Sequence, residues 1–384
     1  MNERRFWVVM LVLLLGGCGG LTQHERASRV LIPALELPDG SVSAKSAAAA
    51  VASPDLLAID SEMEDFLDVY VRSARIQRQR LNLLHQALRS RAIVGLEYDE
   101  QANGAAIETF HRARANCLSY ATVFVALARA TGLDAHFQVV ATKPEWDRRG
   151  DRLAVALHVN AVVNLKGGER FEVDIDPLTR SRIVGTQIIN DNEALALFHN
   201  NVGMELFLNG DSEGGYRHMS RALQLYPELD YLWANIGAIY RSNDQNEDAE
   251  SSYRTALLFD PRSRTALNNL VVLYQTLGEN ERAEEIVQRI SAHRERNPYY
   301  HFQLAETADD EGDYELAVDH LREAISRKDS DAEFYYLMGK VLHKATRLDE
   351  SVQSLQLAIE KAEMYGQREQ IRNYMESVLG EMAM

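Results

Sequence analysis

The stretch ANCLSYATVFVALARATG, residues 115–132, predicts a buried helix that carries a cysteine in its first turn. Its apolar residues recur on one helical face, as at Leu118, Ala121 and Val125, and the Thr-Gly pair at its end suits a helix C-cap. The first turn of a helix presents unpaired N–H groups and the positive end of the helix dipole. Both features favour a thiolate and can stabilise a developing oxyanion, so Cys117 is a candidate nucleophile.

The sequence after this helix changes to the two-residue period of β-strands. Strands are predicted over residues 135–141, 153–165 and 170–175. The turn KGGE, residues 166–169, joins the last two strands as a hairpin. Across this hairpin His158 and Asp174 can face one another, so that the carboxylate orients the imidazole and the imidazole pairs with a thiolate.

Each of these three residues also has a purely structural explanation. A lone histidine in a strand is usually a packing residue, and a free cysteine is often buried and unreactive. Asp176 competes with Asp174 for the third position, because a spacing of two residues puts both on one face of the strand. Asp174 lies deeper in the apolar run, whereas Asp176 precedes a proline and can simply begin a turn. We therefore expect Asp174 to be the carboxylate partner of His158.

These residues resemble the transglutaminase-like superfamily, whose members are related to papain. The matching residues, in the family's order Cys, His, Asp, are Asn116-Cys117, residues 128–133, His158 and Val173-Asp174. The resemblance covers roughly residues 60–190 and implies an α+β papain-like domain with a thiol acyl-transfer triad. The chain departs from the family pattern at Asn160, where an aromatic residue is frequent, and before Cys117, where glycine is common.

The C-terminal half of the chain repeats every 34 residues, with starts at 196, 230, 264, 298 and 332. The unit from 230 comes close to a complete tetratricopeptide (TPR) pattern, with Trp233, Ile236, Gly237, Tyr240, Ala249, Tyr253, Ala256 and Pro261. The resemblance to TPR proteins implies five pairs of helices stacked into an all-α solenoid.

Solenoids of this family bind peptides or proteins on their inner surface. The residues that the resemblance places there are Asn201, Asn235, Asn268, Asn269, Tyr299, Phe302 and Tyr336. Asparagine is common at its position in the family, so a packing role explains the asparagines equally well. We expect a protein or peptide partner on this surface.

The N-terminus has the layout of a bacterial secretion signal. Two arginines precede an apolar run over residues 6–15, which is too short to span a bilayer because a spanning helix needs about 20 residues. Leu-Gly-Gly before Cys18 resembles lipoprotein signals, in which a peptidase cuts before the cysteine and acyl chains such as palmitate are attached. Gly19 is not the aspartate typical of inner-membrane retention, so the resemblance implies an outer-membrane anchor facing the periplasm. The alternative is an ordinary secretory signal with an incidental cysteine.

These features divide the chain into a signal peptide (1–17), a flexible tether (18–54), a transglutaminase-like domain (55–190), five repeats (191–365) and a capping helix (366–384). The tether is predicted because its Ala- and Ser-rich composition shows no amphipathic period. The formal charge of −16 disfavours nucleic acid as a partner, since affinity for nucleic acid comes largely from lysine and arginine. The sequence contains no metal cluster, phosphate loop or cofactor motif, so no cofactor is expected.

The chain has only two cysteines, so acylation of Cys18 leaves Cys117 without a partner for a disulfide. An unpaired thiol in an oxidising compartment is a liability unless it is buried or used. We therefore expect a cysteine peptidase or amidase that acts on a protein or peptide recruited by the repeats, with hydrolysis favoured over cross-linking because water competes. The alternative is a non-catalytic TPR scaffold for an envelope assembly.

Overall fold

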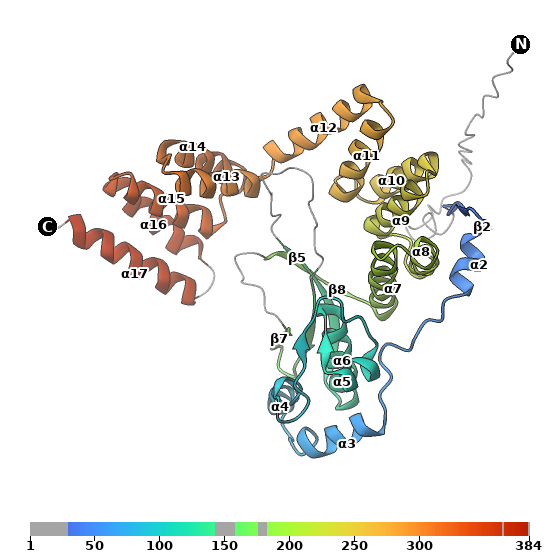
Figure 1. The fold of residues 1–384 in the computed structure, drawn as a ribbon. Coiled ribbons are helices and arrows are strands. Elements are labelled where there is room, and N and C mark those ends of the chain that lie inside the picture. The colour runs from blue at the N-terminus through green and yellow to red at the C-terminus, as the bar shows by residue number, and fades with distance from the viewer. Residues whose placement is uncertain (1–29, 143–157, 176–182, 363–364, 383–384) are drawn as a thin grey trace, which may run out of the picture.

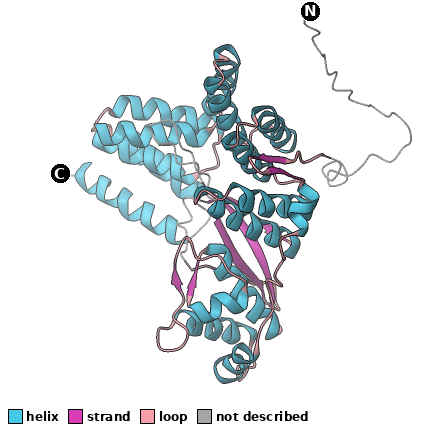
Figure 2. Ribbon diagram, turned by 45° about the vertical axis from the view of Figure 1, so that its right-hand side comes forward, coloured by secondary structure: helices cyan, strands magenta, loops and turns pink. Residues whose placement is uncertain are grey.

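The computed structural model describes residues 30–142, 158–175, 183–362 and 365–382. They form an N-terminal arm, a mixed α/β domain and a long array of paired helices (Figure 1). In Figure 2 the strands of the α/β domain are flanked by helices, whereas the array contains helices alone.

The α/β domain begins with helices and ends with a sheet. Its helices are α3 (Ser61–Tyr70), α4 (Gln77–Arg89), α5 (Ala106–Arg112) and α6 (Cys117–Ala130). Its sheet strands are β5 (Asp134–Thr142), β6 (His158–Asn164), β7 (Arg170–Val173) and β8 (Ile183–Ile189), and the short strands β3 (Glu97–Tyr98) and β4 (Arg114–Ala115) pair in parallel beside them.

The sheet is antiparallel in the order β7-β6-β5-β8. Three of its strands confirm the predicted ones, and the predicted turn joins β6 to β7 with Gly167 and Gly168 at positive φ. Residues 153–157 of the second predicted strand lie outside the described residues. Strand β8 was not predicted from the sequence; it pairs with β5 across a bulge near Ala141.

Helix α6 is the centre of the domain. Leu118 through Ala128 are all buried, and Phe124 and Leu127 are fully so. The apolar faces of β5 and β6 pack on this helix, with Phe137 and Ala161 fully buried in the same core. Burial of α6 fixes the position of its first turn and of Cys117, because a closely packed helix cannot shift without losing contacts throughout its length.

The array consists of five antiparallel helix pairs and a final helix. The pairs are α7 (Asp191–Leu208) and α8 (Ser212–Leu225), α9 (Asp230–Ser242) and α10 (Asn246–Phe259), α11 (Arg264–Thr276) and α12 (Asn280–Glu295), α13 (Pro298–Glu311) and α14 (Tyr314–Arg327), and α15 (Ala332–Lys344) and α16 (Leu348–Lys361). Helix α17 (Tyr365–Met382) follows them. A helix begins at residues 230, 264 and 332 and at Pro298, which are four of the predicted repeat starts.

Small residues bring the two helices of a pair together. A Cβ atom on Gly237 would lie 2.6 Å from the Tyr253 ring, and one on Gly339 would lie 2.6 Å from Leu355. Both partner side chains are fully buried. The period of 34 residues in the sequence therefore reflects close helix packing that recurs once per repeat.

Residues 30–50 are folded, which corrects the prediction of a flexible tether over 18–54. Strands β1 (Leu35–Leu37) and β2 (Gly40–Val42) form a hairpin, and α2 (Ala44–Ala49) packs against α8. The Tyr216 and Tyr240 hydroxyls each donate to the Pro33 carbonyl at 2.5 Å. These partners lie about two hundred residues away along the chain, so the local composition of the arm gave no indication of them.

Leu35 anchors this arm. Its side chain is fully buried in the core of the first three repeats, near Tyr216 and Met219. Gln245 donates to the Ala34 carbonyl at 3.0 Å and accepts from the Glu36 N–H at 2.8 Å. The arm is thus held by main-chain hydrogen bonds and by one apolar side chain.

The array has separate cores along its length. One core extends from the arm through α7 to Ala283 on α12, and another begins on α13 with Phe302. Helix α7 belongs to two cores, since Ala194 and Leu197 pack in the α/β domain and Ala196 packs in the repeats. No linker therefore separates the domain from the first repeat. Within the described ranges, no helix is long and apolar enough to cross a membrane.

Candidate active site

Cys117 is the first residue of α6, at the position that the sequence predicted. The preceding Asn116 caps the helix, because its side chain accepts a hydrogen bond from the Ser119 N–H at 2.9 Å. The Asn116 amide also donates to Asn103 at 2.8 Å. The thiol is half-buried and has no disulfide partner among the described residues. Asparagine thus has a structural task at the place where the family commonly has glycine.

His158 connects Cys117 to Asp174. Its Nε2 atom forms a hydrogen bond with a carboxylate oxygen of Asp174, and its side chain also forms a hydrogen bond with Cys117. Since Nε2 is bonded to the carboxylate, Nδ1 is the ring nitrogen left for the sulfur. The β6–β7 register, extended by one residue, puts Asn160 opposite Asp174, so His158 reaches the carboxylate diagonally across the hairpin.

The surroundings of His158 favour its protonated form. Burial lowers the pKa of His158, but the hydrogen bonds and the charges of Asp174 and Cys117 outweigh burial and raise it to about 10. Both His158 and Asp174 are 9% exposed, so water screens their interaction weakly. An imidazolium held in this way stabilises a thiolate beside it.

A cavity of about 740 Å³ adjoins this pair. Its lining residues are Leu81, Asn82 and His85 of α4, Val140, His158 and Asn160 of β5 and β6, Arg170 to Asp174 along β7, and Ile183 of β8. A volume of this size is within the range of cavities that hold drug-sized ligands. His158 and Asp174 therefore border a space that can accept a substrate, and Cys117 lies next to it through its contact with His158.

The sequence did not indicate His85, which lies in this cavity. Its Nδ1 atom is 3.0 Å from the hydroxyl of Tyr120, one turn after Cys117 on α6. Burial and the nearby Arg89 lower the pKa of His85, although the charge of Asp174 raises it. The cavity thus contains two histidines with opposite pKa shifts, a protonated His158 and a neutral His85.

Arg89 connects α4 to the residues that follow β7. Its guanidinium donates to the Ile175 carbonyl at 2.7 Å, directly after Asp174. Helix α4 therefore contacts both halves of the candidate site, α6 through His85 and the strand end next to Asp174 through Arg89. These contacts join residues that are 35 and 86 positions apart, so no local motif reveals them.

Polar side chains form the floor of the cavity on the sheet. Gln138, which is fully buried, donates to Asn160 and to Glu172 at 3.2 Å each. The Arg170 guanidinium donates to the side-chain amide oxygen of Gln138. Asn160, the departure from the family pattern, thus belongs to a buried polar network.

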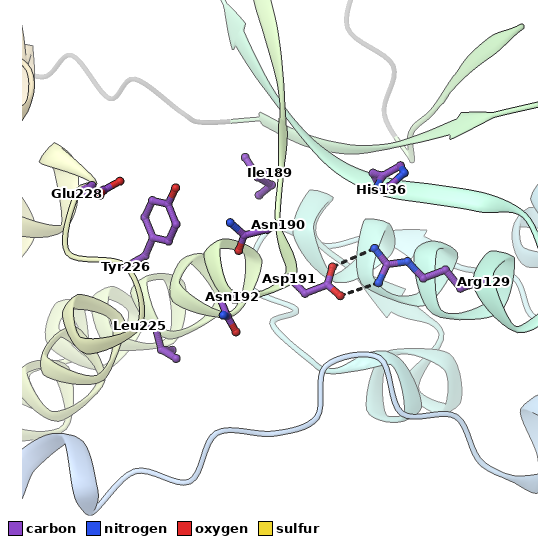
Figure 3. A pocket seen from close by; sticks show the side chains of 9 residues that line it. All are labelled: Arg129, His136, Ile189, Asn190, Asp191, Asn192, Leu225, Tyr226 and Glu228. Atoms are coloured by element: carbon purple, nitrogen blue, oxygen red, sulfur yellow. Dashed lines mark hydrogen bonds and ion pairs between the residues drawn. The ribbon is translucent and has the colours of Figure 1, made fainter. Parts of the chain in front are cut away.

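A second cavity of about 710 Å³ lies where the domain meets the repeats (Figure 3). Its lining residues are Arg129, His136, Ile189, Asn190, Asp191, Asn192, Leu225, Tyr226 and Glu228. The Arg129 guanidinium donates to both carboxylate oxygens of Asp191, at 2.7 and 3.0 Å, and so ties α6 to α7. This second cavity shares none of its lining residues with the first cavity.

The candidate peptide-binding residues of the repeats have different surroundings. Asn235 donates to Asn200 at 2.7 Å, and Asn200 donates to Asn201 at 3.2 Å, which links the first two repeats. Asn268 and Asn269 are half-buried.

The aromatic candidates mostly pack within the repeats. Phe302 is 8% exposed and its ring lies 5.2 Å from that of Phe334, so it is a core residue rather than a surface contact. The Tyr299 hydroxyl donates to Asp331 at 3.1 Å, and the Tyr336 ring lies 6.0 Å from Tyr374.

Two predicted positions lie outside the described residues, Cys18 and Asp176. The part of the chain that the structure describes contains no group of three or more His, Cys, Asp or Glu side chains arranged to hold a metal ion.

Comparison with known families follows the same division of the chain. The family model of the transglutaminase-like superfamily matches residues 67–174, which include Cys117 and His158 and end at Asp174. Two tetratricopeptide repeat models match residues 231–263 and 302–364. The chain contains a transglutaminase-like domain followed by TPR repeats. The predicted fold class, an α+β domain before an all-α solenoid, is confirmed.

Curated relatives match only part of this protein. Photosystem I assembly protein Ycf3 of Rippkaea orientalis is 33% identical over 85 residues, which are 21% of this chain and 49% of that protein. The Ycf3 protein of Cyanophora paradoxa is 29% identical over 113 residues, 27% of this chain and 64% of that protein. The chain thus spans less than two thirds of the length of either relative.

Solved structures match a larger share of the chain than the curated relatives do. MamA is 22% identical with a TM-score of 0.24, over 43% of this chain and 91% of that one. Pseudomonas aeruginosa pilF is 15% identical with a TM-score of 0.26, over 50% and 88%. The TPR repeats support a role in protein–protein interaction, and the transglutaminase-like domain is compatible with cysteine peptidase or acyltransferase chemistry.

Proposed function

We propose that the transglutaminase-like domain is a cysteine peptidase or amidase and that the TPR repeats recruit its protein or peptide substrate. The observation that carries this proposal is the contact of Cys117, in the first turn of α6, with the His158–Asp174 pair that lines the 740 Å³ cavity. A purely structural domain has no need for a half-buried thiol hydrogen-bonded to a protonated histidine.

The chemistry follows from the positions of these groups. The Cys117 thiolate attacks an amide carbonyl carbon, and the oxyanion that forms lies near the unpaired N–H groups at the start of α6. Collapse of this intermediate breaks the C–N bond, and the leaving amine takes a proton from the His158 imidazolium. Water then attacks the thioester and gives a proton to His158, which releases the acid and restores the thiolate.

We also propose that Cys18 carries acyl chains that anchor the protein to the outer membrane, facing the periplasm. Three acyl chains exceed the two that stable anchoring requires. Replacement of Cys18 by serine should move the protein from the membrane fraction to the soluble fraction and abolish labelling with radioactive palmitate. Continued membrane association without palmitate labelling would contradict the anchor.

The enzymatic proposal is tested by the pH dependence of thiol alkylation. A chain that begins at Gly19 contains Cys117 as its only cysteine. With iodoacetamide, we expect fast alkylation at pH 7 that changes little up to about pH 9, because His158 keeps its proton until about pH 10.

The His158→Ala variant supplies the comparison. Without the imidazolium, its alkylation should slow at least tenfold at pH 7 and rise toward about pH 8.5, where unperturbed thiols ionise. Equal rates in the two proteins would mean that no ion pair forms. The repeats would then be the functional part, as a protein-interaction scaffold with an inactive domain.

A further inference from the structure

Among the described residues, strand β7 lies at one edge of the sheet and pairs with β6 alone. The Leu165 N–H donates to the Glu169 carbonyl at 2.8 Å, which fixes the phase of the hydrogen bonds along this hairpin. In an antiparallel pair the bonded positions alternate, so Phe171 and Val173 direct their main-chain groups toward β6. The N–H and carbonyl groups of Arg170 and Glu172 therefore point away from the sheet.

This open edge borders the active-site cavity. Every residue from Arg170 to Asp174 lines it, together with His158. Leu81, Asn82 and His85 of α4 form the opposite wall, and α4 lies close to β7 in Figure 1. The main-chain groups of Arg170 and Glu172 make no hydrogen bond to other parts of the described chain. Within the described part of the chain, the outward main-chain groups of β7 are therefore available to pair with a bound peptide.

We propose that an extended peptide substrate adds as a strand to the free edge of β7, which leads its scissile carbonyl to Cys117 and His158. This inference rests on the proposed peptidase function and names how its substrate binds. An open strand edge pairs with the main chain of a peptide, and side-chain pockets on either side give selectivity. Four residues of β7 span about 13 Å, enough for a segment of about four residues.

The two faces of β7 predict the side chains of this peptide. Residues that lie opposite one another on neighbouring strands point to the same face. A substrate residue next to Glu172 therefore lies on the polar face of the sheet, where Asn160 and Arg170 also line the cavity. Its neighbours meet the apolar face with Phe171, over which the Arg78 guanidinium lies at 5.4 Å. The geometry fits a peptide with alternating polar and apolar side chains.

Substitution of Glu172 tests the role of its outward N–H. Glu172→Pro removes this donor and leaves the hydrogen bonds to β6 in place, and proline is tolerated on a strand edge when its nitrogen faces outward. Glu172→Ala is the matched control, because it loses the same carboxylate but keeps the N–H. The probes are iodoacetamide and the peptidyl chloromethyl ketone acetyl-Leu-Ser-Leu-Ala. We expect the ratio of peptidyl to iodoacetamide inactivation rates to fall five- to tenfold in the proline variant relative to the alanine variant.

A second measurement needs no altered protein and stands if the proline variant fails to fold. N-methylation of one amide of the peptidyl probe at a time should weaken inactivation at every second position, because alternate amides face β7. Equal effects at all positions, together with equal ratios in the two variants, would overturn strand addition. If iodoacetamide alkylation is independent of His158, the peptidase proposal itself fails, so the two failures are distinguishable.

Discussion

His158 has two partners of different function, Asp174 on one ring nitrogen and Cys117 on the other. The Asp174 carboxylate fixes the imidazole ring, and the Cys117 side chain contacts the same ring, so the loss of either partner changes the surroundings of the other. His85 and Tyr120 add a second pair behind them, held by a single hydrogen bond of 3.0 Å. The chemistry of the site therefore depends on how these side chains are charged as well as on where they lie.

Replacement of Asp174 by asparagine keeps the shape of the site and removes its negative charge. Because the folded-state pKa of His158 is raised, its stabilising contribution is complete below pH 6.5 and is lost as the pH rises through about 10. We expect the variant to be about 2 kcal/mol less stable at pH 6, as for other hydrogen bonds to charged groups, with a smaller difference near pH 10. Urea titrations with pulse proteolysis of the transglutaminase-like domain would measure this difference.

An exposed histidine–aspartate pair offers the control. His136 and Asp134 form the same kind of contact at 2.9 Å, but the Asp134 side chain is 61% exposed. Asp134→Asn should change the free energy of unfolding by less than about 1 kcal/mol, since surface ion pairs contribute little. An equal loss at both positions, or a loss at position 174 that persists unchanged at pH 10, would contradict the role given to the buried pair.

The sequence predicted the three catalytic candidates because each is tied to a local pattern. Cys117 begins a helix with a clear apolar face, and the other two residues flank a glycine-rich hairpin turn. His85 has no such pattern, because its contact with Tyr120 exists only once α4 packs on α6. The strand β8 was missed for a related reason: Gly185 and two polar residues follow its first positions, and its pairing with β5 spans more than forty residues.

At the scale of the element, the helix pairs are the part of the fold that the sequence predicts most directly. Four of the five pairs have a small residue where their helices cross, and it recurs with the period of the repeat as Gly203, Gly237, Ala305 and Gly339. The arm is the opposite case, since its composition indicates a tether whereas its contacts are with distant tyrosines. Local composition indicates the structure of a segment in isolation, whereas the arm is stabilised by contacts with the repeats.

Glycine at the helix crossing is therefore expected to be sensitive to substitution. Gly237→Ala places a methyl group against the Tyr253 ring and should cost about 1–3 kcal/mol of stability through overpacking. Gly380→Ala is the control, because a Cβ atom there meets nothing within 4 Å and alanine favours the helix. Thermal unfolding followed by circular dichroism should show a lower midpoint for the first variant alone. A neutral Gly237→Ala would show that the pair can separate without cost.

The arm is expected to stabilise the first repeats through Leu35. Leu35→Ala removes a fully buried side chain and should cost about 2–5 kcal/mol. Leu31 is 84% exposed, so Leu31→Ala is a matched control with an expected change within about 0.5 kcal/mol. Hydrogen exchange of α8 and α9 would report the loss of protection. Equal protection in both variants would mean that the arm is not part of the folded unit.

At the scale of the whole molecule, the repeats divide into two parts. The small residue of the second helix recurs as Ala222, Ala256, Ala324 and Ala358, but the third repeat has Ile290 at this position. The core of the first three repeats ends on α12, and a separate core begins on α13. The transglutaminase-like domain belongs with the first part, because α7 packs in both.

This division predicts that the two parts of the solenoid open independently. Leu321→Ala, in the core of the fourth repeat, should lower the free energy of opening of α13 to α16 by about 2–5 kcal/mol and leave the protection of α9 and α10 unchanged. Leu270→Ala, in the first core, should do the reverse. Hydrogen exchange measured by mass spectrometry separates these helices. A loss of protection that spreads through all repeats in either variant would show that the array opens as one unit.

The docked arm also limits how far the folded protein can lie from an anchor at Cys18. With the chain held from Val30 onward, only twelve peptide steps connect it to Cys18, and at about 3.3–3.6 Å per residue they reach roughly 40 Å. A free segment up to residue 54 would reach about three times as far. If Cys18 carries the proposed acyl chains, the second repeat stays within this radius of the bilayer. The 740 Å³ cavity of the transglutaminase-like domain moves with it, because α7 packs in the cores of both parts. The protein would then act only in a thin layer next to the membrane, and partners deeper in the compartment would lie beyond its reach.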